Sequence, residues 1–268
     1  MTYEDLKSDL AKLFDELSIS KSENIYVTGN ISKFARTRLL KSDILRAITK
    51  SLIESITPLG TIFSPSASMN LCNSDIVFDL AETPSHEMGP LAEFLRLQEN
   101  SVRSFHPFWS ISGLGKNAEL LKDVSRHSYG LFSPWSYFLD ANVRQINFGI
   151  HPSKAVTLIH HIETAVGVPY RYTKEFIHPV IRNQKEIMEP FYMSVLYKDT
   201  DITKRIKLNE HYFEILTQRG QLHHVKHKSG IDIWSFQMSD FFNVVEPIFK
   251  RDIYNYLEHE PKIRPYQQ

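Results

Sequence analysis

The chain has 268 residues, 42% of them hydrophobic and 23% charged, which is the composition of an ordinary globular protein with a substantial core. Its 31 basic and 31 acidic side chains cancel at neutral pH, which argues against a nucleic-acid partner and gives no acidic excess to attract a polycation. The sequence has no apolar run of membrane-spanning length, no secretory signal pattern and a single cysteine, so we expect a cytoplasmic protein without membrane insertion.

The amino-terminal part of the chain alternates between helix and strand patterns. Apolar spacing predicts a helix over residues 3–18, then a buried strand over 24–28. A helix over 42–56, with Ser42 as its cap, precedes a strand over 60–64. Strand, helix and strand with short connections predict parallel pairing, so the pattern indicates the α/β class.

The remaining segments continue this alternation. We expect a loop over 67–87, short helices over 88–97, over 118–124 and from Ser133, and a strand over 144–149. Beyond Pro169 we expect an extended region, a strand over 191–197, a helix over 209–219, a hairpin over 223–236 and helical segments over 239–257. No repeat or linker divides the chain, which predicts one compact α/β domain over 1–268, with a mixed central sheet flanked by helices.

Residues 147–169 hold the densest set of chemically useful side chains. The strand over 144–149 leads to a turn at 151–153 and a helix from about Lys154. Ser153 is the expected cap of this helix, and Gly167 its stop signal. Side chains near the start of this helix would therefore lie beside the end of a sheet strand.

A histidine and a carboxylate share one edge of this predicted helix. Thr157, His160 and Glu163 are spaced three apart, so they lie close in projection, whereas His161 points away. A carboxylate beside an imidazole holds one tautomer and raises the basicity of the other ring nitrogen, as a general base requires. The same spacing also arises by chance on solvated helix faces, so the catalytic and the bland interpretation both stand on spacing alone.

Two other sets of side chains offer alternative chemistry. Cys72 is a candidate nucleophile, but its sequence neighbours include no activating base, so a buried or loop thiol is favoured over a ping-pong mechanism. His223, His224 and His227 have no acidic or cysteine partner close in sequence. A solvated hairpin face explains these histidines better than a metal site, and we expect no metal.

Six segments, in this order, resemble the aminoglycoside 3-N-acetyltransferase family, also called the antibiotic N-acetyltransferase family. They are Gly60–Pro65; Phe78–Asp79 with Thr83–Ser85 and Met88–Arg96; Arg103–Ser110; Ser133–Pro134; the strand ending at Gly149; and Thr157–Glu163. The resemblance spans roughly residues 4–245, and several weak motifs in one order are more specific than any single one. It implies the family's fold and transfer of acetyl from acetyl-CoA to an amine on a sugar.

The resemblance also assigns the catalytic roles. His160 corresponds to the family's general base and Glu163 to its orienting carboxylate. An alkylammonium must lose a proton before its nitrogen attacks a thioester, and a base poised near neutral pH removes it best. The tetrahedral intermediate needs a donor for its oxyanion, for which Thr157 and Ser110 are candidates. Both hydroxyls could equally be helix caps or buried side chains.

By the same resemblance, two segments bind the CoA moiety. The first contains Arg103, Ser104 and His106, with Ser110 following; the alternative is a surface ion pair for Arg103 and packing beside Trp109 for His106. The second is the loop after the first strand, with contacts predicted from the three residues Asn30, Ser32 and Lys33. The family's His-x-Ser-Leu pattern in this loop is replaced by residues 28–31, so its individual contacts do not follow from the resemblance.

The acceptor is less constrained. Asp79 corresponds to an acid that holds a substrate ammonium, or else it is a loop cap. Arg171, Lys174, Arg182 and Lys185 follow the catalytic helix and suit a phosphate. Together with the missing acidic excess, they favour a nucleotide-linked amino sugar, as in cell-surface polysaccharide synthesis, over an aminoglycoside acetylated for antibiotic resistance. The alternative function is that of a non-catalytic member of the fold that binds CoA or a nucleotide. The sequence does not decide between a monomer and a homodimer.

Overall fold

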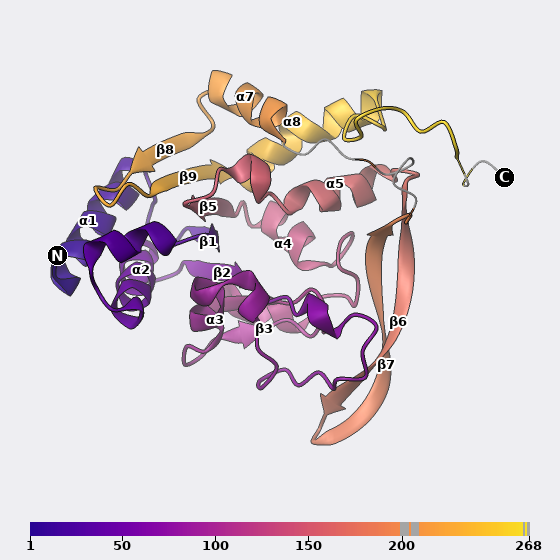
Figure 1. Ribbon diagram of the computed structural model, residues 1–268, viewed down its shortest axis with the longest axis horizontal. Helices are drawn as coiled ribbons and strands as arrows, with labels where there is room; N and C mark the ends of the chain where they lie inside the picture. Colours follow the sequence, from indigo (N-terminus) through magenta and orange to yellow (C-terminus); the bar gives the residue numbers. More distant parts are fainter. Residues whose placement is uncertain (199–203, 205–208, 265, 267–268) are drawn as a thin grey trace.

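The computed structural model describes residues 1–198, 204, 209–264 and 266, which form a seven-stranded sheet, flanking helices and a separate two-stranded hairpin (Figure 1). The sheet contains β1 (Asn24–Gly29), β2 (Thr61–Pro65), β3 (Val102–Arg103), β4 (Ile111–Gly115), β5 (Arg144–Phe148), β8 (His223–Lys226) and β9 (Asp232–Gln237). The hairpin contains β6 (Arg171–Arg182) and β7 (Lys185–Leu196). The α-helices are α1 (Tyr3–Glu16), α2 (Lys41–Ile56), α3 (Pro90–Arg96), α4 (Pro134–Asp140), α5 (Leu158–Val166), α7 (Glu210–Gln218) and α8 (Met238–Arg251).

The sheet is mixed, with parallel pairing at its centre. Its strand order is β3-β4-β2-β1-β5-β9-β8, and β1 pairs in parallel with both β2 and β5. The pairings of β4 with β2 and of β9 with β5 are antiparallel. The predicted parallel pairing of the first two strands is therefore confirmed, and so is the mixed sheet. Because β1, β2 and β5 are parallel, their carboxyl ends lie at one edge of the sheet. The strand order reverses direction at β1, and α/β sheets usually bind ligands at this edge beside such a point.

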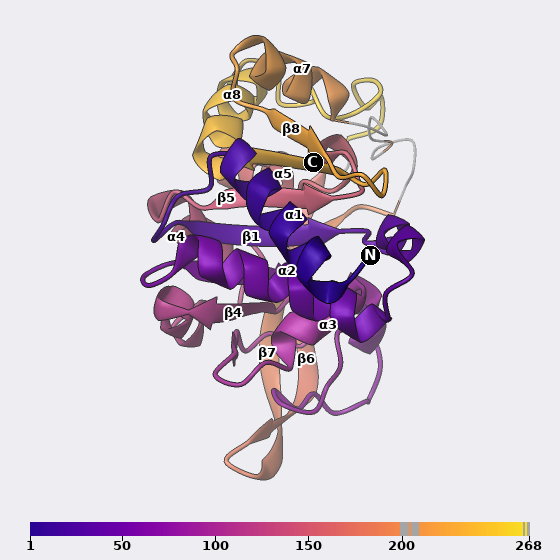
Figure 2. The ribbon, with the colours of Figure 1, turned by 90° about the vertical axis from the view of Figure 1, so that its left-hand side faces the viewer.

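Two helical layers cover the sheet. Helices α1 and α2 pack on one face, as Figure 2 shows, and α1 begins with a capping box in which Thr2 and Asp5 bond each other's backbone N–H groups. The apolar stripe of α1, with Leu6, Leu10 and Phe14, contacts strand residues of the same core cluster. The other face carries α4, α5, α7 and α8 over a second, aromatic-rich cluster. Both faces of the central strands are thus buried, as a parallel arrangement requires.

The β6–β7 hairpin stands along one side of the molecule and projects beyond the sheet (Figures 1 and 2). It starts directly after α5 and is joined to the body by isolated bridges, Phe78 to Val180 and His127 to Tyr192. Its inward face contributes Val180 and Phe191 to a third apolar cluster that also contains Phe78. The hairpin thereby connects the end of α5 to the loop before α3.

Most predicted elements are present, with differences at several helix starts. The helix expected from Ser42 begins at Lys41, after Leu40 in the cap position, and no side chain caps it. The helix expected over 88–97 starts only at Pro90, because Gly89 has an extended, positive-φ backbone. The segment expected as a helix over 118–124 is a 3₁₀ helix, Lys116–Lys122. Among the described residues, no helix combines the length and apolar character needed to cross a bilayer.

Candidate active site

Helix α5 starts later than its sequence suggests. Residues Pro152–Lys154 form a 3₁₀ turn, and Thr157 occupies the cap position of α5. Ser153 does not cap a helix, because its hydroxyl lies 2.8 Å from His151 Nδ1. Gly167 ends α5 in the left-handed conformation, with its N–H bonded to carbonyls of the last turn, as predicted. The result is a nine-residue helix that presents His160 in its first turn.

His160, Glu163 and Arg171 form one compact cluster. His160 Nδ1 lies 2.7 Å from Glu163 Oε2, and Arg171 Nε lies 2.7 Å from the same oxygen. Arg171 Nη2 is 3.0 Å from His160 Nδ1, while its Nη1 donates to the Ser194 carbonyl of β7 at 3.1 Å. The predicted contact between His160 and Glu163 is therefore present, and the first residue of the hairpin completes the cluster.

Burial and charge set the state of this cluster. The side chain of Glu163 is fully buried, that of Arg171 is 8% exposed and that of His160 is 21% exposed. Burial by itself would raise the pKa of Glu163, but the hydrogen bond and electrostatic interaction with His160 and the positive charge of Arg171 lower it below its ordinary value. Glu163 is therefore an ionised acceptor at neutral pH. The adjacent Tyr170 is buried, and this burial raises the pKa of its hydroxyl, so it stays protonated.

Aromatic rings surround the partly exposed imidazole. Tyr129 meets His160 edge to face with ring centroids 5.8 Å apart, and the Tyr256 ring lies at 6.5 Å. The neighbouring His161 points the other way, as predicted, and its Nδ1 accepts the Gly130 N–H. Burial lowers the pKa of His161 to about 4, so its ring is neutral near pH 7. Of the two adjacent histidines, only His160 contacts a carboxylate among the described residues.

A cavity of about 930 Å³ opens at the carboxyl ends of the parallel strands. Its walls come from the loop after β1, the start of α2, the end of β2, the segment before α3 and the turn after β5; they include Thr28, Gly29, Asn30, Ile31, Ser32, Leu39, Lys41, Ile44, Pro65, Met88, Gly89, Ile150, Lys154 and Ala155. Apolar side chains dominate this lining, Lys41 and Lys154 add positive charge, and Glu87 adds one negative charge. The uncapped start of α2 also faces the cavity, because its first residue, Lys41, is part of the wall.

The cavity and the histidine cluster are consecutive in the chain. Ala155 lines the cavity, Thr157 caps α5, and His160 follows within the first turn. The turn after β5 therefore forms part of the cavity wall and leads within a few residues into α5. The carboxyl end of β5 thus leads both to the cavity wall and to the helix that carries His160.

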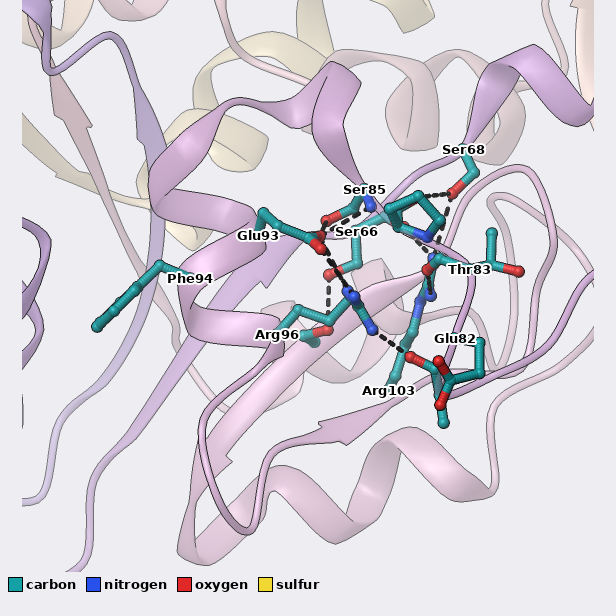
Figure 3. Close-up of polar contacts among 12 residues, drawn as sticks. Ser66, Ser68, Glu82, Thr83, Ser85, Glu93, Phe94, Arg96 and Arg103 are labelled. Atoms are coloured by element: carbon teal, nitrogen blue, oxygen red, sulfur yellow. Dashed lines mark hydrogen bonds and ion pairs between the residues drawn. The ribbon is translucent and has the colours of Figure 1, made fainter. Parts of the chain in front are cut away.

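Arg103 is buried and bonds to two segments that continue into the cavity wall. Its guanidinium donates to the carbonyls of Ser66 at 2.6 Å and Thr83 at 2.5 Å, and its Nε donates to the Ser110 hydroxyl at 2.9 Å (Figure 3). Burial lowers the pKa of Arg103 to about 9, which still leaves it charged at neutral pH. These bonds join the segment after β2 to the segment before α3, and both segments reach the cavity wall.

A second arginine supports the same segment. Arg96 pairs with Glu93 at 2.7 Å and donates to the Ala81 carbonyl at 2.5 Å. Glu93 in turn accepts from the backbone N–H and the hydroxyl of Ser85, each at 2.8 Å, as Figure 3 shows. The hydrogen bond from Arg96 is the main cause that lowers the pKa of Glu93 to about 2. The segment from Ala81 to Ser85 is consequently tied to helix α3 through side chains.

His106 and Ser104 also bond to backbone groups of their own segment. His106 Nδ1 accepts the N–H groups of Phe108 at 3.3 Å and Trp109 at 3.0 Å, and burial lowers the pKa of this ring to about 3. The Ser104 hydroxyl accepts the Ile111 N–H at 2.9 Å. This geometry matches the packing alternative for His106 and gives Arg103, Ser104 and Ser110 internal partners. Their direct contact with CoA stays a prediction.

The comparisons with known proteins now bear on this geometry. The model of the family described as aminoglycoside 3-N-acetyltransferase matches residues 40–250. The chain belongs to this family. The resemblance noted in the sequence is thereby confirmed, together with the enzyme class of N-acetyltransferases and the acetyl-CoA donor that define the family.

Several solved structures share the fold of this chain. AAC-VIa, solved with bound sisomicin, is 17% identical with a TM-score of 0.76, and the match covers 91% of this chain and 97% of that one. AAC-IIIb, solved with CoASH, is 20% identical with a TM-score of 0.74, covering 97% and 99%. YokD from Bacillus subtilis is 18% identical with a TM-score of 0.74, covering 92% and 99%. No curated protein matches the chain by sequence.

Within the aminoglycoside 3-N-acetyltransferase fold, the loop after β1 is only partly arranged as predicted. Asn30 and Ser32 line the cavity, but Lys33 does not; its ammonium pairs with Asp232 at 3.3 Å. Lys41 and Lys154 line the cavity in its place and were not singled out from the sequence as cofactor contacts. The sequence could have indicated them, because Lys41 begins a helix that follows β1 and Lys154 lies in the turn that follows β5.

The structure does not bring Asp79 to the histidine cluster. Phe78 bonds Ile181 of β6, whereas Arg171 contacts His160 at the other end of the same strand. Ten strand residues correspond to about 30 Å, so the two places are well separated. The Asp79 carboxylate accepts the N–H groups of Ala81 and Glu82, as in the loop-cap alternative.

The basic residues that follow α5 also do not form one cluster beside His160. Arg171 is engaged with Glu163, whereas Arg182 lies at the far end of β6, pairs with Glu189 at 3.1 Å and stacks on Phe105. Lys174 lies over the Phe176 ring, and Lys185 begins β7 at the opposite end of the hairpin. A long strand therefore separates Arg171 and Lys174 from Arg182 and Lys185, and their role toward a phosphate stays a prediction.

Cys72 lacks the features of an activated nucleophile. It is half-buried at the edge of the third apolar cluster, and burial raises the pKa of its thiol. The thiol is therefore protonated at neutral pH, and thiolate is the reactive form. This agrees with the interpretation that Cys72 is a packing residue.

Proposed function

We propose that this protein transfers the acetyl group of acetyl-CoA directly to an amino group of an amino sugar, with His160 as the general base and Glu163 as its orienting carboxylate. The observation that carries the proposal is the 2.7 Å contact between His160 Nδ1 and the buried, ionised Glu163. A carboxylate in this position favours the proton on Nδ1 and thereby directs the basic lone pair of Nε2 outward.

The cavity beside α5 has the character of a CoA site. Its mostly apolar wall suits the pantetheine arm, and Lys41 and Lys154 suit phosphates. The uncapped start of the 16-residue helix α2 adds backbone N–H groups and a positive dipole end for the diphosphate. Its volume of about 930 Å³ lies in the range of ligand pockets. Asn30 and Ser32 are proposed contacts from the loop after β1.

The chain's own groups then account for the proton transfers. An alkylammonium and acetyl-CoA give an N-acetyl amine, the CoA thiol and one proton. The ammonium loses its first proton to solvent, and His160 takes the second N–H proton as the carbon–nitrogen bond forms. His160 returns this proton to the sulfur as the carbon–sulfur bond breaks. Glu163 stabilises the imidazolium between these steps.

Thr157 is the proposed hydroxyl donor to the oxyanion. It occupies the cap position of α5 without capping the helix through its side chain, and it precedes His160 by three residues. Ser110, the other candidate, already donates to the Ser66 carbonyl at 2.6 Å and accepts from Arg103. Its single proton is therefore committed within the protein.

The acceptor is proposed at the level of an amino sugar. The positive cluster that favoured a nucleotide-linked sugar is dispersed along β6, so that preference loses its structural support. The solved relative AAC-VIa binds the aminoglycoside sisomicin, and an aminoglycoside is a direct candidate here. A nucleotide-linked amino sugar remains the second candidate, with the cytoplasm as the proposed compartment for either reaction.

The test is release of CoA thiol by the purified protein, with acetyl-CoA fixed and a panel of aminoglycosides and nucleotide-linked amino sugars as acceptors. We expect acceptor-dependent thiol release with at least one member, and the N-acetyl product identifies the acceptor class. Acetyl-CoA binding, measured by calorimetry, is expected without any acceptor. Absence of binding would overturn the donor assignment; binding without turnover on any amine would favour the non-catalytic alternative.

A further inference from the structure

Arg171 and Glu163 both contact the same ring nitrogen of His160, so the protonation of that nitrogen depends on both side chains. His160 Nδ1 lies 2.7 Å from Glu163 Oε2 and 3.0 Å from Arg171 Nη2. An imidazole nitrogen carries either a proton or a lone pair in the ring plane. It can therefore donate to Glu163 or accept from Arg171, but not both at once.

Each choice places the second ring nitrogen in a different state. When Nδ1 donates to Glu163, Nε2 has a lone pair and can act as a base. When Nδ1 accepts from Arg171, the proton of a neutral ring sits on Nε2, and the ring is a donor. Arg171 is thus in direct competition with the proton that makes His160 a base.

Charge adds to this competition. A buried carboxylate alone would hold the imidazolium form of His160 as an ion pair, and a base that is already protonated cannot accept a proton. Arg171 Nε lies 2.7 Å from the same carboxylate oxygen, and the arginine side chain is only 8% exposed. Its charge therefore compensates that of Glu163 where solvent screens little.

Arg171 is also held in place independently of the histidine. Its Nη1 donates to the Ser194 carbonyl at 3.1 Å, and β6 pairs Arg171 with Leu196 of β7. The backbone of the hairpin therefore holds the guanidinium in place. An arginine that binds a substrate phosphate would instead have its guanidinium N–H groups available to solvent.

We propose that Arg171 is a positioning residue that holds His160 as a neutral imidazole near neutral pH, because its charge neutralises that of Glu163. The titratable groups that face this cluster include the phenols of Tyr129 and Tyr256 beside the imidazole and those of Tyr170 and Tyr212 beside Glu163. The inference rests on the proposed role of His160, but it concerns the ring's protonation, which is measurable without turnover.

The test is an NMR titration of the His160 ring in the intact protein, with the pH profile of kcat/KM as a second readout. In Arg171→Gln we expect the His160 pKa to rise by about 1–2 units, and the acid limb of the profile to move up equally. Arg171→Lys restores the charge and is expected to return most of the shift. Lys174→Gln, which removes a charge three residues along the same strand, is the matched control and should leave the pKa within about 0.3 units.

Glu163→Gln gives an independent measurement if Arg171→Gln does not fold. With the carboxylate removed, the uncompensated charge of Arg171 should lower the His160 pKa by about 1 unit or more below the ordinary value of a histidine. A His160 pKa that returns to the ordinary value in Glu163→Gln, or that is unchanged in Arg171→Gln, would overturn the inference. If His160→Ala instead retains turnover, the proposed base is wrong while the titration result still stands.

Discussion

Replacing Arg103 by methionine should loosen the wall of the cavity and destabilise the fold. The variant keeps an unbranched side chain but leaves three short hydrogen bonds unmade, at the Ser66 carbonyl, the Thr83 carbonyl and the Ser110 hydroxyl. A hydrogen bond to a charged group contributes about 1.5 kcal/mol, so the three lost bonds sum to about 4.5 kcal/mol, while the Ser66 carbonyl and the Ser110 hydroxyl keep their bond to each other. Burying the charge of Arg103 costs free energy, as its pKa of about 9 reflects. Methionine removes this cost, which offsets part of the loss. The expected net loss is about 3 kcal/mol.

Urea unfolding followed by circular dichroism measures this loss as a lower midpoint at an unchanged slope. Because the segments that Arg103 joins reach the cavity wall, the KM for acetyl-CoA should rise several-fold while kcat changes little. Arg46→Met is the matched control: its guanidinium pairs with Asp43 on the surface, and the loss should stay below about 0.5 kcal/mol. An Arg103→Met midpoint equal to that of the wild type would refute the assignment of Arg103 to wall support.

Three further outcomes are expected. Cys72→Ala should leave acetyl transfer within about two-fold of the wild type, because direct transfer does not use a thiolate; loss of turnover would instead support a ping-pong enzyme. Gly29→Ala should destabilise the fold by about 3 kcal/mol or more in urea, since the glycine has φ +129° and a methyl group would overlap the Phe148 carbonyl; a stable variant would show that β1 and β5 can separate. Lowering the pH should also destabilise the protein through His106 and His161, whose folded pKa values of about 3 and about 4 lie below the ordinary 6.5. The unfolded chain binds these protons first, so stability is full above pH 6.5 and falls by about 2 kcal/mol per histidine by pH 5. Equal urea midpoints at pH 7.5 and pH 5 would contradict neutral buried rings.

The parts of the site that follow from local chain geometry were predictable. Residues three apart on one helix meet wherever the helix lies, so the contact between His160 and Glu163 followed from spacing once a helix was assumed. The opposite direction of His161 followed from the same rule. The central α/β order was equally local, because short strand–helix–strand connections leave few alternatives to parallel pairing.

The parts that depend on contacts between distant segments were not predictable. Arg171 looked like a phosphate ligand, and only the hairpin geometry places it on Glu163. Lys33 looked like a CoA contact, but Asp232, 199 residues away, pairs with it. Ser153 satisfied the rule for a helix cap, yet His151 engages its hydroxyl and delays α5. For Arg171 and Lys33 a tertiary partner replaced the role that the neighbouring sequence indicated, and for Ser153 a histidine two residues away did.

The most direct test of the central claim compares His160→Ala with the wild type in two measurements on the same preparations. Calorimetry should show acetyl-CoA binding within about two-fold of the wild type, because His160 is not part of the described cavity wall. Acceptor-dependent thiol release should fall by about 100-fold or more, since a general base contributes about that much to the rate. Full turnover by His160→Ala, with binding intact, would show that another group removes the proton and would contradict the account.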